Sequence, residues 1–206
     1  GMDIGARMTV VRLASGGLFV PAPIRLTDPL KAALDDLGPV EVAVAPNSMH
    51  HMFLGPFLAA YPAARGYAAP GAAAKHRELP PTPIPPPGAA PWSGDLDHLR
   101  LEGLPKLDEH AFFHRKTRTL ILTDFLFYFQ EKKGFLLRLY MRLAGGFGKP
   151  VQTSILKAMV KDRAAARATV DGLLAWDFDR VIMAHRDILE RGGKPALRDA
   201  TAWMSK

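Results

Sequence analysis

The pattern of apolar and polar positions changes its period from segment to segment along this chain. Val40, Val42 and Val44 alternate with other residues in a short apolar run, which predicts a buried strand. Thr27 precedes a run with apolar residues at helical spacing and Gly38 follows it, which predicts a capped helix between them. Strand and helix signals follow one another to the end of the chain and indicate a mixed α/β protein.

Further strands are predicted where β-branched and aromatic residues cluster: a hairpin over Met8–Val20, then Ala64–Ala69, His98–Glu102, His110–Arg115, Leu120–Asp124 and Asp179–Ala184. Further helices are predicted after His51, after Pro70, from Asp162 and over Lys194–Met204. The three strands between residues 98 and 124 lie too close together for parallel crossovers, each of which needs about a dozen residues. We therefore expect two sheets in one core with helices outside, rather than a doubly wound parallel sheet.

Composition narrows the class of protein. The 206 residues suffice for a single domain over residues 1–206, in which residues 79–91, with seven prolines, form an extended surface loop. Gly1 ahead of Met2 is typical of a cleaved expression tag. The absence of cysteine excludes disulfides and thiolate metal sites, and no run of about 18 apolar residues predicts a membrane span. A cytoplasmic protein is expected. Its net charge of +7 permits an anionic partner without requiring one.

Candidate chemistry lies at the ends of three predicted strands. His50 and His51 follow the strand that begins at Val40, Asp124 ends the strand over Leu120–Asp124, and His185 follows the last strand. Polar residues at such strand ends commonly form the ligand sites of α/β proteins. The three strand ends therefore predict one shared site.

These segments resemble the metallo-β-lactamase superfamily over nearly the whole chain. That resemblance implies a four-layer αββα sandwich with metals at the strand ends of one edge. The superfamily motif His-x-His-x-Asp-His falls at the end of Val42–His51, its bridging aspartate falls on Asp124, and its final Gly-His falls on Ala184-His185.

The chain departs from this motif at several positions. Pro46 and Ser48 stand where the first two motif histidines are expected, and His50 stands in place of the motif aspartate. The later histidine of the superfamily falls near Lys106. The resemblance thus implies that one metal position is lost.

The resemblance implies that the other metal position is kept, with His50, His51, Asp124 and His185 as its ligands. Imidazole and carboxylate ligands suit a single divalent ion, with zinc as the first choice and iron or manganese as alternatives. Four protein ligands usually close a site, so chemistry requires either a fifth coordination place or one ligand that does not contact the ion. His50 is expected to be that ligand, because adjacent residues rarely reach one ion equally well.

Two functions follow from the resemblance. The first is a metal-dependent hydrolase of an ester, lactone, amide or phosphoester, in which Asp124 orients water activated by the metal. Lys106 supplies a fixed positive charge to an anionic substrate, or instead pairs with Asp108 or Glu109. The second is a non-catalytic protein with the same fold, its site empty of metal, that binds a small anionic ligand or a partner.

The aromatic and basic segment 125–150 leaves three interpretations open. It forms a lid over the site, an amphipathic surface for an acidic membrane, or a helix that packs in the core and contacts a second copy in a homodimer. The membrane interpretation is a third function hypothesis, that of a peripheral membrane protein. Dispersed basic residues and the lack of a recognised motif argue against nucleic acid as a partner.

Overall fold

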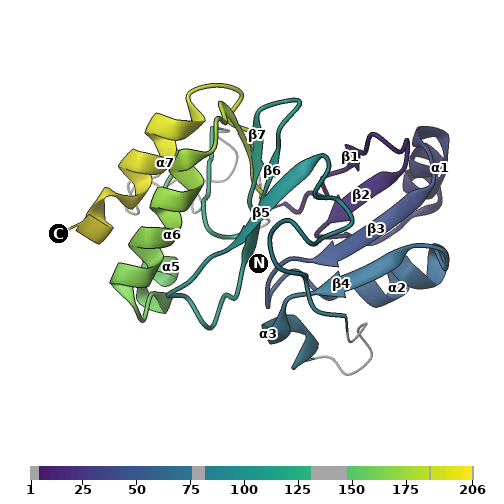
Figure 1. The fold of residues 1–206 in the computed structure, drawn as a ribbon, viewed down its shortest axis with the longest axis horizontal. Helices are drawn as coiled ribbons and strands as arrows, with labels where there is room; N and C mark the ends of the chain where they lie inside the picture. The colour runs from purple at the N-terminus through teal and green to yellow at the C-terminus, as the bar shows by residue number, and fades with distance from the viewer. Residues whose placement is uncertain (1–4, 76–81, 131–147, 186, 206) are drawn as a thin grey trace.

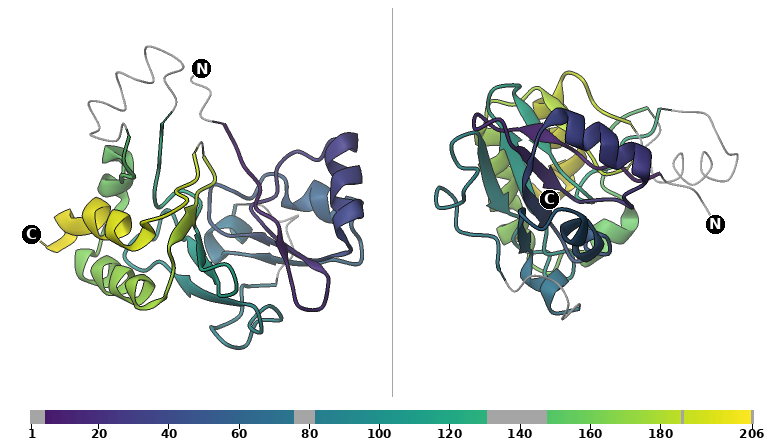
Figure 2. Two further views of the ribbon diagram at one scale, coloured as in Figure 1. Left: turned by 90° about the horizontal axis from the view of Figure 1, so that it is seen from above. Right: turned by 90° about the vertical axis from the view of Figure 1, so that its right-hand side faces the viewer.

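Two four-stranded sheets lie face to face, with helices on the outer side of each (Figure 1). The computed structural model describes residues 5–75, 82–130, 148–185 and 187–205. Figure 2 shows the same layers from two further directions. The predicted αββα arrangement is confirmed, and the doubly wound parallel sheet is wrong.

The first sheet and its helices come from the first part of the chain. Its strands are β1 (Val11–Arg12), β2 (Leu18–Pro21), β3 (Val40–Ala45) and β4 (Arg65–Ala68). β1 and β2 are antiparallel, whereas β2, β3 and β4 run parallel. The helices of this half are α1 (Asp28–Leu37), α2 (Leu54–Ala60) and α3 (Pro70–Ala73). The Thr27 side chain caps α1, as predicted, by accepting from the Leu30 backbone N–H.

The second sheet contains β5 (Leu96–Arg100), β6 (His110–His114), β7 (Thr119–Ile121) and β8 (Arg180–Ile182). β5, β6 and β7 are antiparallel neighbours, and β8 pairs with β7 in parallel. Its helices are α5 (Ser154–Met159), α6 (Arg163–Ala175) and α7 (Gly193–Thr201), followed by the 3-10 helix η1 (Ala202–Ser205). The short helix α5 was not predicted from the sequence. The remaining strands and helices of this half lie where the sequence predicts them.

Three apolar layers hold the sandwich together. Between the sheets, the fully buried Trp92 contacts Phe19 at 5.0 Å between ring centroids and Tyr67 at 5.2 Å. On the outer face of the first sheet, Leu34 and Phe57 belong to one cluster with the strand side chains. A third cluster joins the second sheet to α6 and α7. Burial of this apolar surface is the main source of stability in such a domain.

Most of the aromatic and basic segment falls outside the described residues, because residues 131–147 are not among them. The lid, membrane and homodimer interpretations of 125–150 therefore remain predictions. At the edges of the segment, Phe127 and Val151 form an antiparallel bridge. In the proline-rich loop, Thr82 and Pro83 run beside Ala68 of β4. Within the described part of the chain, no helix has the length and apolar character needed to cross a membrane.

His110 is a buried titratable group at the start of β6, with 7% of its surface exposed. Among the described residues, neither of its ring nitrogens has a hydrogen-bond partner. Burial is the largest cause that lowers the pKa of His110 to about 4. The folded protein therefore holds this imidazole neutral, whereas in the unfolded chain it takes up a proton near pH ~6.5.

This difference predicts a loss of stability as the pH falls from about 6.5 towards 4, because in that window only the unfolded chain binds the proton. Between about pH 7.5 and pH 5, wild type should lose about 2 kcal/mol more free energy of unfolding than His110→Met. Urea denaturation at the two pH values measures the difference. Equal losses in the two proteins would contradict it.

Candidate metal site

Three segments deliver side chains to one end of the sandwich. Ile121 of β7 and Ile182 of β8 are register partners in a parallel pair. Asp124 and His185 each follow three residues later, so both side chains emerge at the same end of the second sheet. His50 follows the end of β3 and reaches the same place from the first sheet. The parallel pairing is what makes two ligands so distant in sequence into neighbours.

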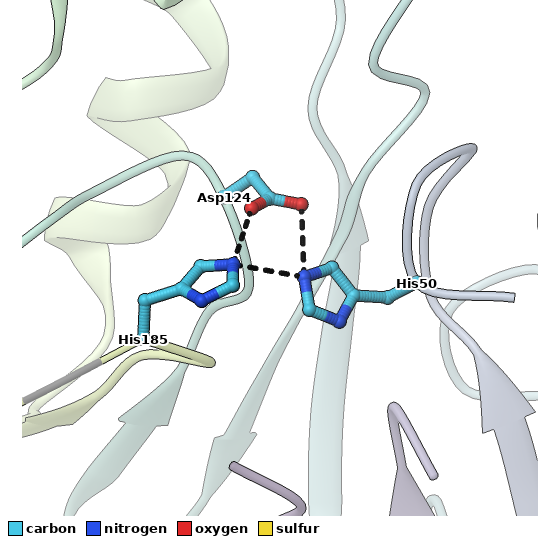
Figure 3. Close-up of side chains that lie close together, drawn as sticks. All are labelled: His50, Asp124 and His185. Carbon is cyan, nitrogen blue, oxygen red and sulfur yellow. Dashed lines mark hydrogen bonds and ion pairs between the residues drawn. The ribbon is translucent and has the colours of Figure 1, made fainter. Parts of the chain in front are cut away.

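The side chains of His50, Asp124 and His185 point toward one another (Figure 3). The two carboxylate oxygens of Asp124 lie 3.3 Å from His50 Nε2 and 3.2 Å from His185 Nε2. The two Nε2 atoms are 3.3 Å apart. Two ligands bound tetrahedrally to one zinc ion, each at about 2.0–2.1 Å, stand about 3.3–3.5 Å apart. These separations fit a single ion.

A hydrogen bond outside the cluster orients His185 as a metal ligand. Its Nδ1 lies 2.6 Å from the backbone carbonyl oxygen of Gly5, so Nδ1–H donates there. The lone pair of Nε2 is then directed to the cluster. Metal-ligating histidines typically use their second ring nitrogen in this way. Phe127 stacks on the same imidazole at 5.7 Å between ring centroids and restricts its rotation further.

The charges in the cluster favour a cation. Burial acts to raise the pKa of Asp124, but hydrogen bonds with His185 and His50 outweigh it and hold this pKa well below its usual range. For His185, burial acts to lower the pKa, and the interaction with Asp124 outweighs it and raises the pKa. An ionised carboxylate among converging nitrogen lone pairs is the electrostatic setting in which a proton or a metal ion is held.

Asn47 links the segments that carry two of these side chains. Its fully buried amide nitrogen lies 2.8 Å from Asp124 Oδ2 and 2.8 Å from Thr123 Oγ1. Its amide oxygen accepts the backbone N–H groups of Met49 and His50, at 2.9 and 2.7 Å. One side chain thus holds the turn that presents His50 and also the carboxylate of Asp124. The sequence offers no periodic signal for this role; a buried asparagine beside a strand end is the only hint.

Glu109 completes this network from the start of β6. It is fully buried, and its two carboxylate oxygens accept the backbone N–H groups of Thr123 and Asp124, both at 2.8 Å. The Asn47 amide also donates to it, at 3.1 Å. Burial and then the charge of Asp124 raise the pKa of Glu109. Glu109 was also missed as a site residue in the sequence, where it was considered only as a partner of Lys106.

The fourth predicted ligand, His51, lies outside the cluster. Among the described residues, the group whose ligand atoms lie within 4.8 Å of one another consists of His50, Asp124 and His185. His51 instead lines the adjoining pocket, which has a volume of about 420 Å³. The structure thus brings His50, rather than His51, to Asp124 and His185, opposite to the expectation that His50 would be the histidine to step out. Asn47 accounts for the difference, because it binds the backbone of His50 and fixes the turn.

The position where the resemblance places a lost metal is occupied by direct protein contacts. Ser48 Oγ donates to the backbone carbonyl of Lys106 at 2.5 Å, and the Ser48 N–H donates to the carbonyl of Leu107 at 3.0 Å. The Lys106 side chain is exposed and does not line the pocket. The ammonium group that lies near this position belongs to Lys75, whose Nζ donates to the Ser48 carbonyl at 2.8 Å.

The predicted ion pair of Lys106 with a neighbouring carboxylate is wrong. Asp108 binds Arg100 Nε at 2.8 Å and the backbone N–H of Gly71 at 2.6 Å. Glu109 is committed to the network described above. Lys106 thus contacts the neighbourhood of the site through its backbone carbonyl, which binds Ser48, and not through its side chain.

Comparison with solved structures identifies the fold. The chain is similar to the DIM-1 metallo-β-lactamase (TM-score 0.63, 12% identity, covering 97% of this chain and 86% of the other). It is also similar to a metallo-β-lactamase from Pontibacter korlensis (0.61, 12%, 98% and 87%) and to TTHA1623 in a di-iron-bound form (0.57, 16%, 91% and 91%). The predicted resemblance to the metallo-β-lactamase superfamily is thereby confirmed at the level of the fold.

Sequence comparison adds a family. No curated protein sequence matches this chain. A family model described as a domain of unknown function, DUF4336, matches residues 2–143, more than half of the 206 residues. The chain belongs to the DUF4336 family. Two members of the cluster in this DUF4336 protein, His50 and Asp124, lie inside the matched region, and His185 lies beyond it.

The donor set of this DUF4336 protein is chemically suited to a divalent metal ion. Two imidazole nitrogens and one carboxylate suit zinc, iron or manganese. Three protein ligands leave coordination positions open, which is typical of catalytic rather than structural zinc sites. The pocket that His50, Asp124 and His185 line gives a small molecule access to this cluster.

We predict that Asn47 supports both stability and metal retention. Asn47→Ala removes a donor from two buried carboxylates, so the free energy of unfolding should fall by about 1–3 kcal/mol and metal affinity by about 10–100-fold. Asn47→Asp should be worse, since it places a third carboxylate against the other two. Chemical denaturation and competition with a chelator measure the two effects.

The matched control is Asp171→Asn, which removes a carboxylate that pairs with Arg167 on the exposed face of α6. It should change stability by less than about 0.5 kcal/mol and leave metal affinity unchanged. Wild-type metal affinity in Asn47→Ala would refute the positioning role.

Proposed function

We propose that this protein is a metal-dependent hydrolase with a mononuclear site formed by His50, Asp124 and His185. The observation that supports it most directly is the convergence of their ligand atoms within 4.8 Å at the wall of an open pocket. Zinc is the proposed ion, with iron or manganese as alternatives. The substrate class is a small molecule with an ester, lactone, amide or phosphoester bond.

A single ion is favoured over two by the contacts at the other corner. Pro46 and Ser48, at the positions of two motif histidines, carry no metal-binding side chain of the usual kinds. Ser48 is also closed against the turn at Lys106 by two hydrogen bonds. The polar groups around Ser48 bind one another, so their arrangement does not require a second metal ion.

The ion would supply Lewis acidity, which polarises a carbonyl or phosphoryl oxygen and lowers the pKa of water. The protein contributes orientation. Asp124 presents both carboxylate oxygens to the cluster, because Asn47 fixes the side chain and Glu109 fixes its backbone N–H. His185 keeps Nε2 directed inward through its bond to the Gly5 carbonyl. Because these side chains are already oriented, they need to move less during the reaction.

His51 is proposed as the proton-accepting group rather than as a ligand. It lines the same pocket as the three proposed ligands and is only partly buried. Imidazole is the side chain that most often acts as a general base in enzymes. Lys106 is left without a catalytic role, because its side chain is exposed and outside the pocket.

The proposal predicts one equivalent of metal per chain in protein purified without chelator. His50→Ala and His185→Ala should each reduce this content to near zero, because two remaining ligands bind a divalent ion weakly. His51→Ala should keep the metal. Elemental analysis of purified protein, with His114→Gln as a histidine control outside the cluster, measures the contents.

The same variants test catalysis. With an ester as substrate, His51→Ala should lower kcat by about 10²–10⁴-fold at unchanged metal content, as expected for loss of a general base. Stoichiometric metal without hydrolysis of any ester, lactone, amide or phosphoester would instead favour the non-catalytic alternative. Two equivalents of metal would contradict the mononuclear site.

A further inference from the structure

The pocket beside the proposed metal site has an apolar wall. Apart from its imidazoles and one carboxylate, it is lined by apolar side chains, among them Met49, Met52 and Phe53. Met49 and Met52 are 44% and 67% exposed, which is unusual for large apolar residues. Flexible methionines at an open surface are typical of sites that accept apolar groups of varying shape.

A second cavity continues this surface along α2. It has a volume of about 480 Å³ and shares two lining residues, Ile24 and Phe53, with the first. Pro56, Phe57 and Ala60 of α2 line it further. The two cavities adjoin at Ile24 and Phe53, and the residues that line either of them are together called the apolar groove, which has His50, Asp124 and His185 at one end.

The charged side chains that line the groove affect which ligands can bind there. Among the residues that the structure describes, no lysine or arginine lines the first cavity, and the carboxylate of Asp124 does. Arg25, which is exposed, is the charged residue among those that line the second. Without a bound metal ion, an anionic head group at that end would meet the carboxylate of Asp124 and, among the described lining residues, no cationic side chain, which is unfavourable. The expectation of an anionic substrate stays a prediction.

We propose that the groove binds an uncharged substrate with an extended apolar group, such as the ester of a medium-chain acid. The ester lies at the proposed metal site, and the acyl chain lies over Ile24 and Phe53 along α2. The position of the groove beside the proposed metal site and the apolar side chains that line it, among them Met49, Met52 and Phe53, support this occupant. The substrate class rests on the proposed hydrolase function; binding of the apolar group does not.

The reaction then consumes one water molecule for each ester. A bond forms between the water oxygen and the acyl carbon, and the bond between that carbon and the alcohol oxygen breaks. One proton of water passes to the leaving alcohol and the other is released from the acid product. No further co-reactant is required.

Binding is tested first, with uncharged ligands that cannot be hydrolysed. A series of 2-alkanones from four to ten carbons displaces a neutral fluorescent probe, N-phenyl-1-naphthylamine, from the full-length protein with and without added zinc. The Kd should fall about two- to fourfold for each methylene that is buried. Without added zinc, alkanoates of matched length should bind more weakly than the ketones, because the carboxylate of Asp124 repels them.

Two variants locate the binding. Ile24→Asn, in the wall that both cavities share, should flatten the dependence of Kd on chain length. Ile155→Asn is the matched control, because Ile155 is 64% exposed on α5 and lines neither cavity. Met52→Asn gives a second test that leaves the core intact, since this side chain is 67% exposed. Circular dichroism confirms that each variant is folded.

Hydrolysis of p-nitrophenyl esters from acetate to decanoate then separates the two proposals. A value of kcat/KM that rises with chain length in wild type but not in Ile24→Asn supports both. Ketone binding that strengthens with chain length, without hydrolysis, supports the apolar ligand and counts against the hydrolase. Hydrolysis of acetate and decanoate at equal kcat/KM, or ketone binding independent of chain length, overturns the apolar ligand.

Discussion

The hydrogen bonds of the Asn47 side chain are the constraint on which the site depends. The two sheets are held together by an apolar layer, and such a layer fixes distance better than it fixes the direction of a polar side chain. Asn47 supplies the direction: its amide oxygen binds the backbone of His50 from the first sheet, and its amide nitrogen binds Asp124 from the second. The neighbouring backbone joins the sheets as well, since the Ser48 N–H donates to the carbonyl of Leu107, but Asn47 is the residue that contacts both His50 and Asp124.

The network also explains how two carboxylates are tolerated in the interior. Glu109 accepts two backbone N–H groups and the Asn47 amide, and Asp124 meets two imidazoles and the same amide. Burying a carboxylate without such partners is strongly unfavourable. The remaining negative charge is concentrated at the open end of the sandwich, where the apolar groove begins. A cation at the cluster and an uncharged apolar ligand beside it are therefore consistent with the same electrostatic field.

Much of the fold could be predicted from the sequence, because apolar periodicity and caps such as Thr27 act locally. The site was predictable only in part. Asp124 and His185 follow strands whose ends are visible in the sequence, whereas the choice between His50 and His51 depends on a turn that Asn47 shapes through side-chain bonds. Glu109 gives no periodic signal either, because its partners are Asn47, Thr123 and Asp124, in other segments of the chain. Polar contacts between segments distant in sequence leave no local pattern.

The central claim is that three side chains from the two sheets bind one metal ion. Anomalous diffraction from crystals grown with zinc, recorded on both sides of the zinc absorption edge, tests it directly. The account predicts one peak per chain, about 2.0–2.2 Å from a carboxylate oxygen of Asp124 and from the Nε2 atoms of His50 and His185. No peak between these atoms, or a second peak near Ser48, would contradict it.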